Sequence, residues 1–178
     1  ILPIQEYFNR KISPCALCSS QSQLSQYIKF DKLQPFVGQR THPVLLLGHI
    51  PQVRKSSTRH VIKVTLDLDN DKGQLKEYIV KEVLSPLGID LNWCVATNLV
   101  KCHTTQMPED IRIEGLPFMS AAFDVCKCHL MEEVRLLHPC LIISLSEQVS
   151  NLLQQEFVKG HNPRPMKEIF ATCRSVAV

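Results

Sequence analysis

Three short apolar runs do most to limit the fold of this chain. They are rich in β-branched and aliphatic residues and cover residues 43–48, 93–100 and 140–145. Continuous apolar runs of this length are typical of strands that are buried on both faces of a parallel sheet. They are far shorter than the roughly 20 apolar residues that a membrane helix needs, so the sequence predicts no transmembrane span and no membrane partner.

Segments with helical periodicity alternate with these runs. Apolar residues recur every three or four positions in residues 73–87, 120–138 and 146–158. The alternation predicts an α/β fold, a three-layer α/β/α sandwich with a mainly parallel central sheet. In such folds, ligands bind beyond the carboxyl ends of the strands. One more strand is expected at residues 170–178, where the sequence stops.

Length and composition fit a single globular domain. The 178 residues, 44% hydrophobic and 21% charged, predict one domain over residues 1–178, cut short at its C-terminal end. The net charge of +3 permits contact with a polyanion but does not predict one. No secretory signal is visible, so the eight cysteines are expected to be reduced thiols or metal ligands in an intracellular protein.

Several cysteines occupy positions that suit a metal centre. Cys15 and Cys18 form a CxxC pair in a loop-like stretch, where two thiolates can reach one metal centre. Cys102 follows the predicted strand 93–100 and is therefore expected at the carboxyl edge of the sheet.

Two further cysteines lie near the start of the predicted helix 120–138. At about 100° per residue, Cys126 and Cys128 point to roughly opposite sides of that helix. Cys126 shares the apolar face with Leu130, so it is the inward candidate, and Cys128 is expected near the surface or as a substitute ligand. Cys94 and Cys140 lie in apolar strands and are expected to be small buried hydrophobic residues.

The order of these motifs resembles that of the iron–sulfur uracil-DNA glycosylases. A CxxC pair is followed by a glycine turn at residues 46–51, by Thr-Asn-Leu-Val-Lys-Cys at 97–102, and by Cys126 with its helix and the next strand. The resemblance runs from Cys15 to Leu153, and residues 97–102 are its most specific part.

The resemblance implies a [4Fe–4S] cluster. By position its ligands correspond to Cys15, Cys18, Cys102 and Cys126, and sulfur donors suit iron in such a cluster. The spacing from Cys102 to Cys126 is longer than is usual for the family, so Cys128 stays open as the fourth ligand.

The resemblance also implies a site for an extruded uracil at the strand ends. Asn98 would read the base, because its amide accepts from N3–H and donates to O4, a pairing that cytosine would reverse. Gly48 belongs to the substrate-binding turn. His49 stands where the family carries an acidic residue that positions water, and a histidine can act as a base near neutral pH. Gln52 replaces the second glycine of that turn.

Two other family motifs are missing. No Gly-x-Pro-Phe-Val-Gly segment follows the first motif, and the late His-Pro motif is expected after residues 170–178, beyond the last residue. The basic residues Arg54, Lys55 and Arg59 are candidates for contacts with DNA phosphates, and a solvated basic loop is the alternative.

The resemblance therefore implies a DNA-repair protein that binds uracil-containing DNA and, if it is an enzyme, hydrolyses the N-glycosidic bond. Two alternatives stay open. One is a catalytically degenerate member of the same fold that binds nucleic acid or protein, as the altered first motif suggests. The other is a structural zinc protein that uses the same four cysteines.

Overall fold

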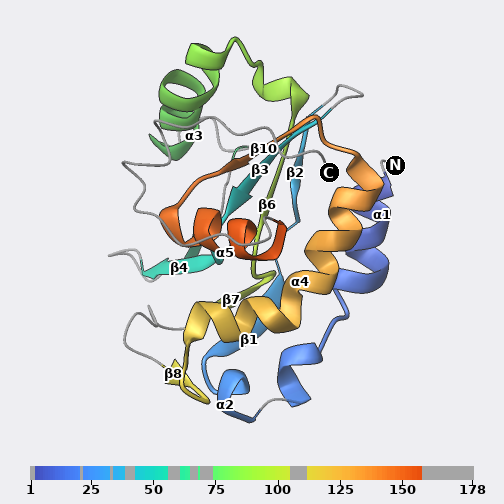
Figure 1. Cartoon of the computed structure of the whole chain (residues 1–178), viewed down its shortest axis with the longest axis vertical. Helices are drawn as coiled ribbons and strands as arrows, with labels where there is room; N and C mark the ends of the chain where they lie inside the picture. The colour runs from blue at the N-terminus through green and yellow to red at the C-terminus, as the bar shows by residue number, and fades with distance from the viewer. Residues whose placement is uncertain are drawn as a thin grey trace.

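The computed structural model describes residues 3–20, 22–32, 34–38, 43–55, 61–64, 68, 74–104 and 112–157. Arg59 and the strand expected at residues 170–178 lie outside this part of the chain. Within it, the fold is mixed α/β and contains a four-stranded, mostly parallel sheet together with helices (Figure 1). None of the helices described is long and apolar enough to cross a membrane.

The mostly parallel sheet contains the three apolar runs. Its strands, in the spatial order β10-β3-β6-β2, are β10 (Leu141–Ser144), β3 (Val44–Gly48), β6 (Cys94–Asn98) and β2 (Phe36–Val37). β10, β3 and β6 run parallel, and β2 pairs antiparallel with β6. The prediction of three parallel strands from the apolar runs is therefore confirmed.

Burial differs between these strands. Every residue of β3 and β6 is buried, because each strand has a neighbour on both sides and contributes to cores on both faces. β10 lies at an edge of the sheet as described, and its first residue, Leu141, is exposed. The expected burial of Cys94 is confirmed. That of Cys140 is wrong, because this residue precedes the edge strand and is exposed.

Helices form in all three segments that were predicted to be helical. The first segment contains α3 (Gln74–Tyr78), the π-helix η3 (Ile79–Leu84) and the 3₁₀ turn η4 (Ser85–Leu87). The second and third are α4 (Phe118–Leu137) and α5 (Glu147–Phe157).

The π-helix changes which residues of the first segment face inward. Ile79 and Leu84 are both buried although they are five positions apart, which matches the i→i+5 repeat of a π-helix. Leu87, which the regular 3.6-residue period places on the apolar face, is 58% exposed. The segment ends at Gly88, which adopts a left-handed conformation with a φ of 66°.

Alternate residues of β3 pack into two different hydrophobic clusters. Leu45 and Leu47 pack with apolar residues of α4 and α5, among them Phe123, Leu130 and Val149. Val44 and Leu46 pack with Ile79 and Leu84 of η3. Helical residues from two separate parts of the chain therefore share cores with the same strand.

The chain also forms elements that its periodicity did not predict. A second sheet has the order β1-β7-β4-β5, with strands β1 (Ile28–Lys32), β7 (Cys102–Thr104), β4 (Gln52–Lys55) and β5 (Val61–Val64). A small hairpin contains β8 (Arg112–Ile113) and β9 (Leu116–Pro117), and η5 (Leu91–Trp93) is a 3₁₀ turn before β6. Arg54 and Lys55, the candidates for contacts with DNA phosphates, lie in β4, paired with β5, so the alternative of a basic loop does not describe these two residues.

The N-terminal residues form α1 (Pro3–Tyr7), η1 (Phe8–Ile12), η2 (Leu17–Ser20) and α2 (Ser22–Ser25). In Figure 1, α1 lies alongside α4, and the two helices are in contact. The loop that carries Cys15 is thereby brought next to the helix that carries Cys126.

Gly38, which follows β2, lies very close to the neighbouring backbone. A Cβ atom there would be 2.3 Å from the carbonyl oxygen of Asn92, and the Gly38 N–H already donates to the Cys94 carbonyl at 2.8 Å. We expect Gly38→Ala to lower the free energy of unfolding by roughly 1–3 kcal/mol, because backbone must shift to admit the methyl group. Denaturant unfolding measures this loss, and an unchanged midpoint would contradict the close approach.

Candidate metal centre and strand-end site

Four cysteines from three separate parts of the chain meet near the end of the mostly parallel sheet. Cys15 follows η1, Cys18 lies in η2, Cys102 begins β7 and Cys126 lies in α4. Cys18, Cys102 and Cys126 are buried in one hydrophobic cluster, whereas Cys15 is half-buried. All seven cysteines within the described residues are free thiols.

The pKa values of these thiols show that they influence one another. Hydrogen bonding to Cys102 and Cys126 raises the pKa of the Cys18 thiol. The same interaction with Cys18 lowers the pKa of Cys102, and it lowers that of Cys126 to about 7. The pKa of Cys15 is raised by burial and also by the nearby charges of Cys102 and Cys126. Each of the four thiols therefore responds to at least one of the others.

Positive charge and N–H groups surround the cysteines. The Lys32 ammonium donates to the backbone carbonyl of Cys15 at 2.5 Å, and its charge adds to the effect of Cys18 in lowering the Cys102 pKa. At Cys126, after the larger effect of Cys18, both the backbone N–H and the ammonium of Lys101 lower the pKa. Such groups stabilise thiolates, the form that binds metals. Lys32 was not foreseen, since only the pairing of β1 with β7 brings it opposite Cys102.

The donor set suits a metal centre in its chemistry. Four cysteine sulfurs are soft ligands, which iron–sulfur clusters and structural zinc both use. The side chains are not arranged as a finished site, because no three Cys, His, Asp or Glu groups of the described residues are placed to hold an ion.

Cys126 and Cys128 lie on different sides of α4. Cys126 is buried beside Cys18 and Cys102, whereas Cys128 is exposed and its thiol donates to the Val125 carbonyl at 3.7 Å. This difference follows the helical phase expected from the sequence.

His129 also contacts this group and was not predicted as a site residue. Its Nε2 atom lies 3.2 Å from the Cys15 sulfur, and its Nδ1 atom lies 2.9 Å from the Tyr7 hydroxyl. Burial lowers the pKa of His129, and the charges of Lys101 and Lys32 lower it further. The sequence held one signal for this residue, since His129 lies three positions after Cys126 and such residues are neighbours on a helix surface.

The predicted base-binding residues lie together at the carboxyl ends of β3 and β6. Gly48 is directly opposite Asn98 in the parallel register. The Leu99 N–H donates to the Gly48 carbonyl at 2.9 Å, and the Val100 N–H donates to the His49 carbonyl at 3.1 Å. His49 is half-buried and Asn98 is 8% exposed. The structure thus brings Gly48, His49 and Asn98 to one edge.

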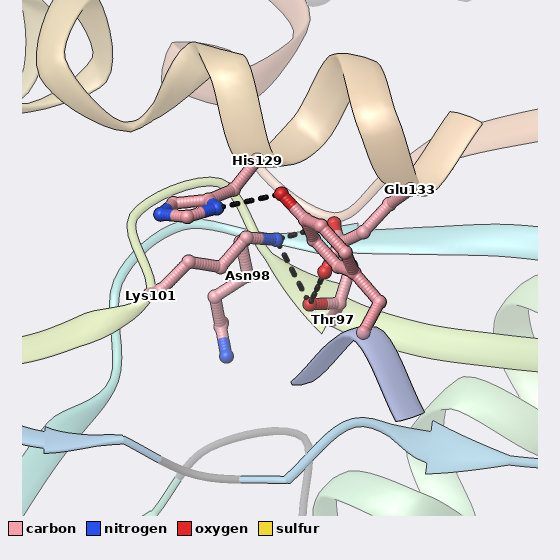
Figure 2. Close-up of polar contacts among 6 residues, drawn as sticks. Thr97, Asn98, Lys101, His129 and Glu133 are labelled. Atoms are coloured by element: carbon pink, nitrogen blue, oxygen red, sulfur yellow. Dashed lines mark hydrogen bonds and ion pairs between the residues drawn. The ribbon is translucent and has the colours of Figure 1, made fainter. Parts of the chain in front are cut away.

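A buried ion pair joins this edge to α4. The Lys101 ammonium lies 2.5 Å from Glu133 Oε2, and it also donates to Thr97 Oγ1 at 3.0 Å and to the Asn98 carbonyl at 2.7 Å (Figure 2). Lys101 is 5% exposed and Glu133 is fully buried. Burial raises the pKa of Glu133, while the charge of Lys101 opposes that shift. The Asn98 side chain points away from this network (Figure 2).

The remaining predicted site residues are those expected to contact DNA phosphates. Arg54 and Lys55 lie in β4, whose neighbour β7 begins at Cys102. Arg59 is outside the described residues.

One cavity of about 160 Å³ lies elsewhere, between the N-terminal helices and the segment before β2. Its lining residues are Gln5, Phe8, Asn9, Gln34 and Pro35, so none of the predicted site residues lines it.

Comparison with models of known protein families finds no match, and comparison with curated proteins finds no significant relative.

Proposed function

We propose that this chain is an iron–sulfur protein similar to the uracil-DNA glycosylases, and that Cys15, Cys18, Cys102 and Cys126 hold a [4Fe–4S] cluster. One observation supports the proposal: the CxxC pair Cys15 and Cys18 lies together with Cys102 and Cys126, which are distant from it in sequence, next to the strand ends that carry Gly48 and Asn98. A [4Fe–4S] cluster commonly has four cysteine ligands. In this fold the cluster would tie the N-terminal loop to β7 and α4.

The proposal includes the three-layer α/β/α arrangement. It is supported by the packing of Leu45 and Leu47 with α4 and α5, and by the packing of Val44 and Leu46 with η3. Since successive side chains of a strand point to opposite faces, helical residues pack against both faces of β3.

Asn98 is the proposed reader of the base. An extruded uracil offers N3–H as a donor and O4 as an acceptor, and an asparagine amide can pair with both. The pairing of β3 with β6 supports this role, because it holds the Gly48 backbone beside Asn98. The Lys101 hydrogen bond to the Asn98 carbonyl further restrains the backbone from which the amide projects.

His49 is the proposed base. In hydrolysis, the N-glycosidic bond breaks with its electron pair going to the uracil, and the oxygen of a water molecule forms the new bond to the sugar carbon. His49 would orient this water and accept its proton. An imidazole adds no negative charge to stabilise a positively charged sugar, so the rate is expected to be lower than with a carboxylate in this position.

The proposed partner is uracil-containing DNA. Arg54 and Lys55 would contact phosphates from β4, with Arg59 beyond the described end of this strand. Such contacts raise affinity for any DNA sequence and weaken as salt concentration rises.

A second function on the same fold is a binding module without catalysis. The low exposure of Asn98 and the histidine in place of an acidic residue both favour it. A structural zinc protein with the same cysteines is the third reading, since sulfur ligands also suit zinc.

A glycosylase assay separates the first two functions. We expect the cluster-loaded full chain to release uracil from DNA and to leave the matched thymine duplex intact. Asn98→Asp should lower activity by the equivalent of about 1–3 kcal/mol, because an ionised carboxylate offers no donor to O4. Asn92→Asp is the matched control, as it makes the same change at an exposed position and should leave activity unchanged. Binding of uracil-containing DNA without release of uracil would favour the binding module. Equal binding and equal cleavage of the uracil-containing and thymine duplexes would exclude a uracil-specific site.

A further inference from the structure

Tyr7, His129 and Cys15 form a chain of polar contacts that the proposed function does not use. The Tyr7 hydroxyl is 2.9 Å from His129 Nδ1, and His129 Nε2 is 3.2 Å from the Cys15 sulfur. The two rings also pack edge to face, with centroids 6.0 Å apart. Figure 2 shows the ring of His129 with its polar contact, close to the network of Lys101. The chain links α1, α4 and the CxxC loop.

The direction of these hydrogen bonds follows from the ligand chemistry. A cysteine that binds a metal is a thiolate and has no proton to donate, so Nε2 of His129 must carry the hydrogen. In the neutral imidazole, Nδ1 is then an acceptor, and the Tyr7 hydroxyl must donate to it. Tyr7 can do so, because burial raises its pKa to about 12 and it keeps its proton at neutral pH.

We propose that His129, held in one tautomer by Tyr7, donates a hydrogen bond to the Cys15 sulfur and thereby raises the reduction potential of the bound cluster. This inference rests on the proposed function, because it requires a cluster at Cys15. An N–H donor withdraws negative charge from the sulfur and so stabilises the reduced form, which carries one more electron. His129 is thus a positioning residue that acts through Cys15.

The arrangement also distinguishes Cys15 from the other three cysteines. Cys18, Cys102 and Cys126 are buried among apolar residues, whereas Cys15 is half-buried. Burial raises the pKa of the Cys15 thiol, and the backbone N–H of Leu17 opposes that shift. The His129 N–H is the second proposed donor to the same sulfur. Removing the His129 donor should therefore change the reduction potential of the cluster and leave the iron content nearly unchanged.

The experiment is a redox titration of the anaerobically purified, cluster-loaded full chain, with dithionite supplying the single electron. His129→Phe keeps a ring against Tyr7 but has no donor, and we expect it to shift the reduction equilibrium about tenfold toward the oxidised form, about 59 mV for a one-electron couple. His129→Gln retains an N–H donor and should recover most of the potential. The matched control is His138→Asn, at the exposed end of the same helix, where an asparagine tolerates the left-handed backbone.

Each outcome decides the inference. An unchanged potential in His129→Phe, or a potential in His129→Gln as low as in His129→Phe, would overturn it. If His129→Phe fails to fold, Tyr7→Phe decides: its loss of the hydroxyl donor must lower the potential in the same direction, and no shift would overturn the inference. Wild-type protein without iron would overturn both this inference and the proposed cluster. Iron-loaded protein with the same reduction potential in all variants would overturn this inference alone.

Discussion

Protein purified anaerobically is expected to be brown and to contain about four irons per chain, and the Cys126→Ala variant is expected to lose this iron. Cys126 is buried beside Cys18 and Cys102, so the alanine variant removes one of the four proposed ligands. Iron analysis and the visible absorption spectrum measure the loss. The effect should be close to complete, because one iron of the cluster would then lack its protein ligand and three cysteines would hold the cluster less firmly.

Cys128→Ala is the matched control, two residues away on the same helix. Its thiol is exposed and donates only to the carbonyl of its own helical turn, so the variant should keep both iron and colour. Loss of iron in Cys128→Ala with retention in Cys126→Ala would contradict the assignment of the fourth ligand. Colourless wild-type protein with one zinc would exclude the iron–sulfur cluster and support a structural zinc site.

The Lys101→Met variant is expected to be strongly destabilised. It leaves the fully buried carboxylate of Glu133 without its positive partner, and a buried pair broken on one side typically loses about 3–5 kcal/mol of stability. Denaturant unfolding of the cluster-loaded protein, followed by circular dichroism, gives the shift in midpoint. Iron content is measured in parallel, because Lys101 adjoins Cys102.

A double variant separates the buried charge from other effects. Lys101→Met with Glu133→Leu removes both charges and fills the space with apolar groups, so most of the lost stability should return. The control is Lys81→Met, which breaks the ion pair of Lys81 with Glu77. This pair has the same 2.5 Å length, but both of its side chains are exposed, so little change in stability is expected. A double variant as unstable as Lys101→Met would show that the loss comes from packing and not from an unpaired charge.

The parts of the fold that could be predicted from the sequence are those with a strong local pattern. Residues 43–48, 93–100 and 140–145 are continuous apolar runs, and each forms a parallel strand of the same sheet. α4 and α5 likewise follow their apolar periodicity closely. Leu87 was misplaced because the chain forms a π-helix and a 3₁₀ turn there, and both depart from the 3.6-residue period on which the prediction rested.

The strands of the second sheet were not predicted, for a different reason. β1, β4 and β7 are short and polar, with residues such as Lys32, Arg54 and His103, so alternation of apolar and polar residues hardly marks them. Their pairing is long-range, since Lys32 is opposite Cys102. Hydrogen bonds between distant segments determine such strands, and a local pattern carries little trace of them.

For the candidate site, the sequence alone determined which residues have the right chemistry. The CxxC pair, Cys102 at the end of an apolar strand and Cys126 on the apolar face of a helix follow from spacing and helical phase, which depend only on local backbone geometry. Tertiary structure alone decided what surrounds them. Lys32 and His129 reach the cysteines, and Tyr7 reaches His129, because α1 packs against α4 and β1 pairs with β7. These contacts close loops of many residues and are stabilised by the folded core as a whole.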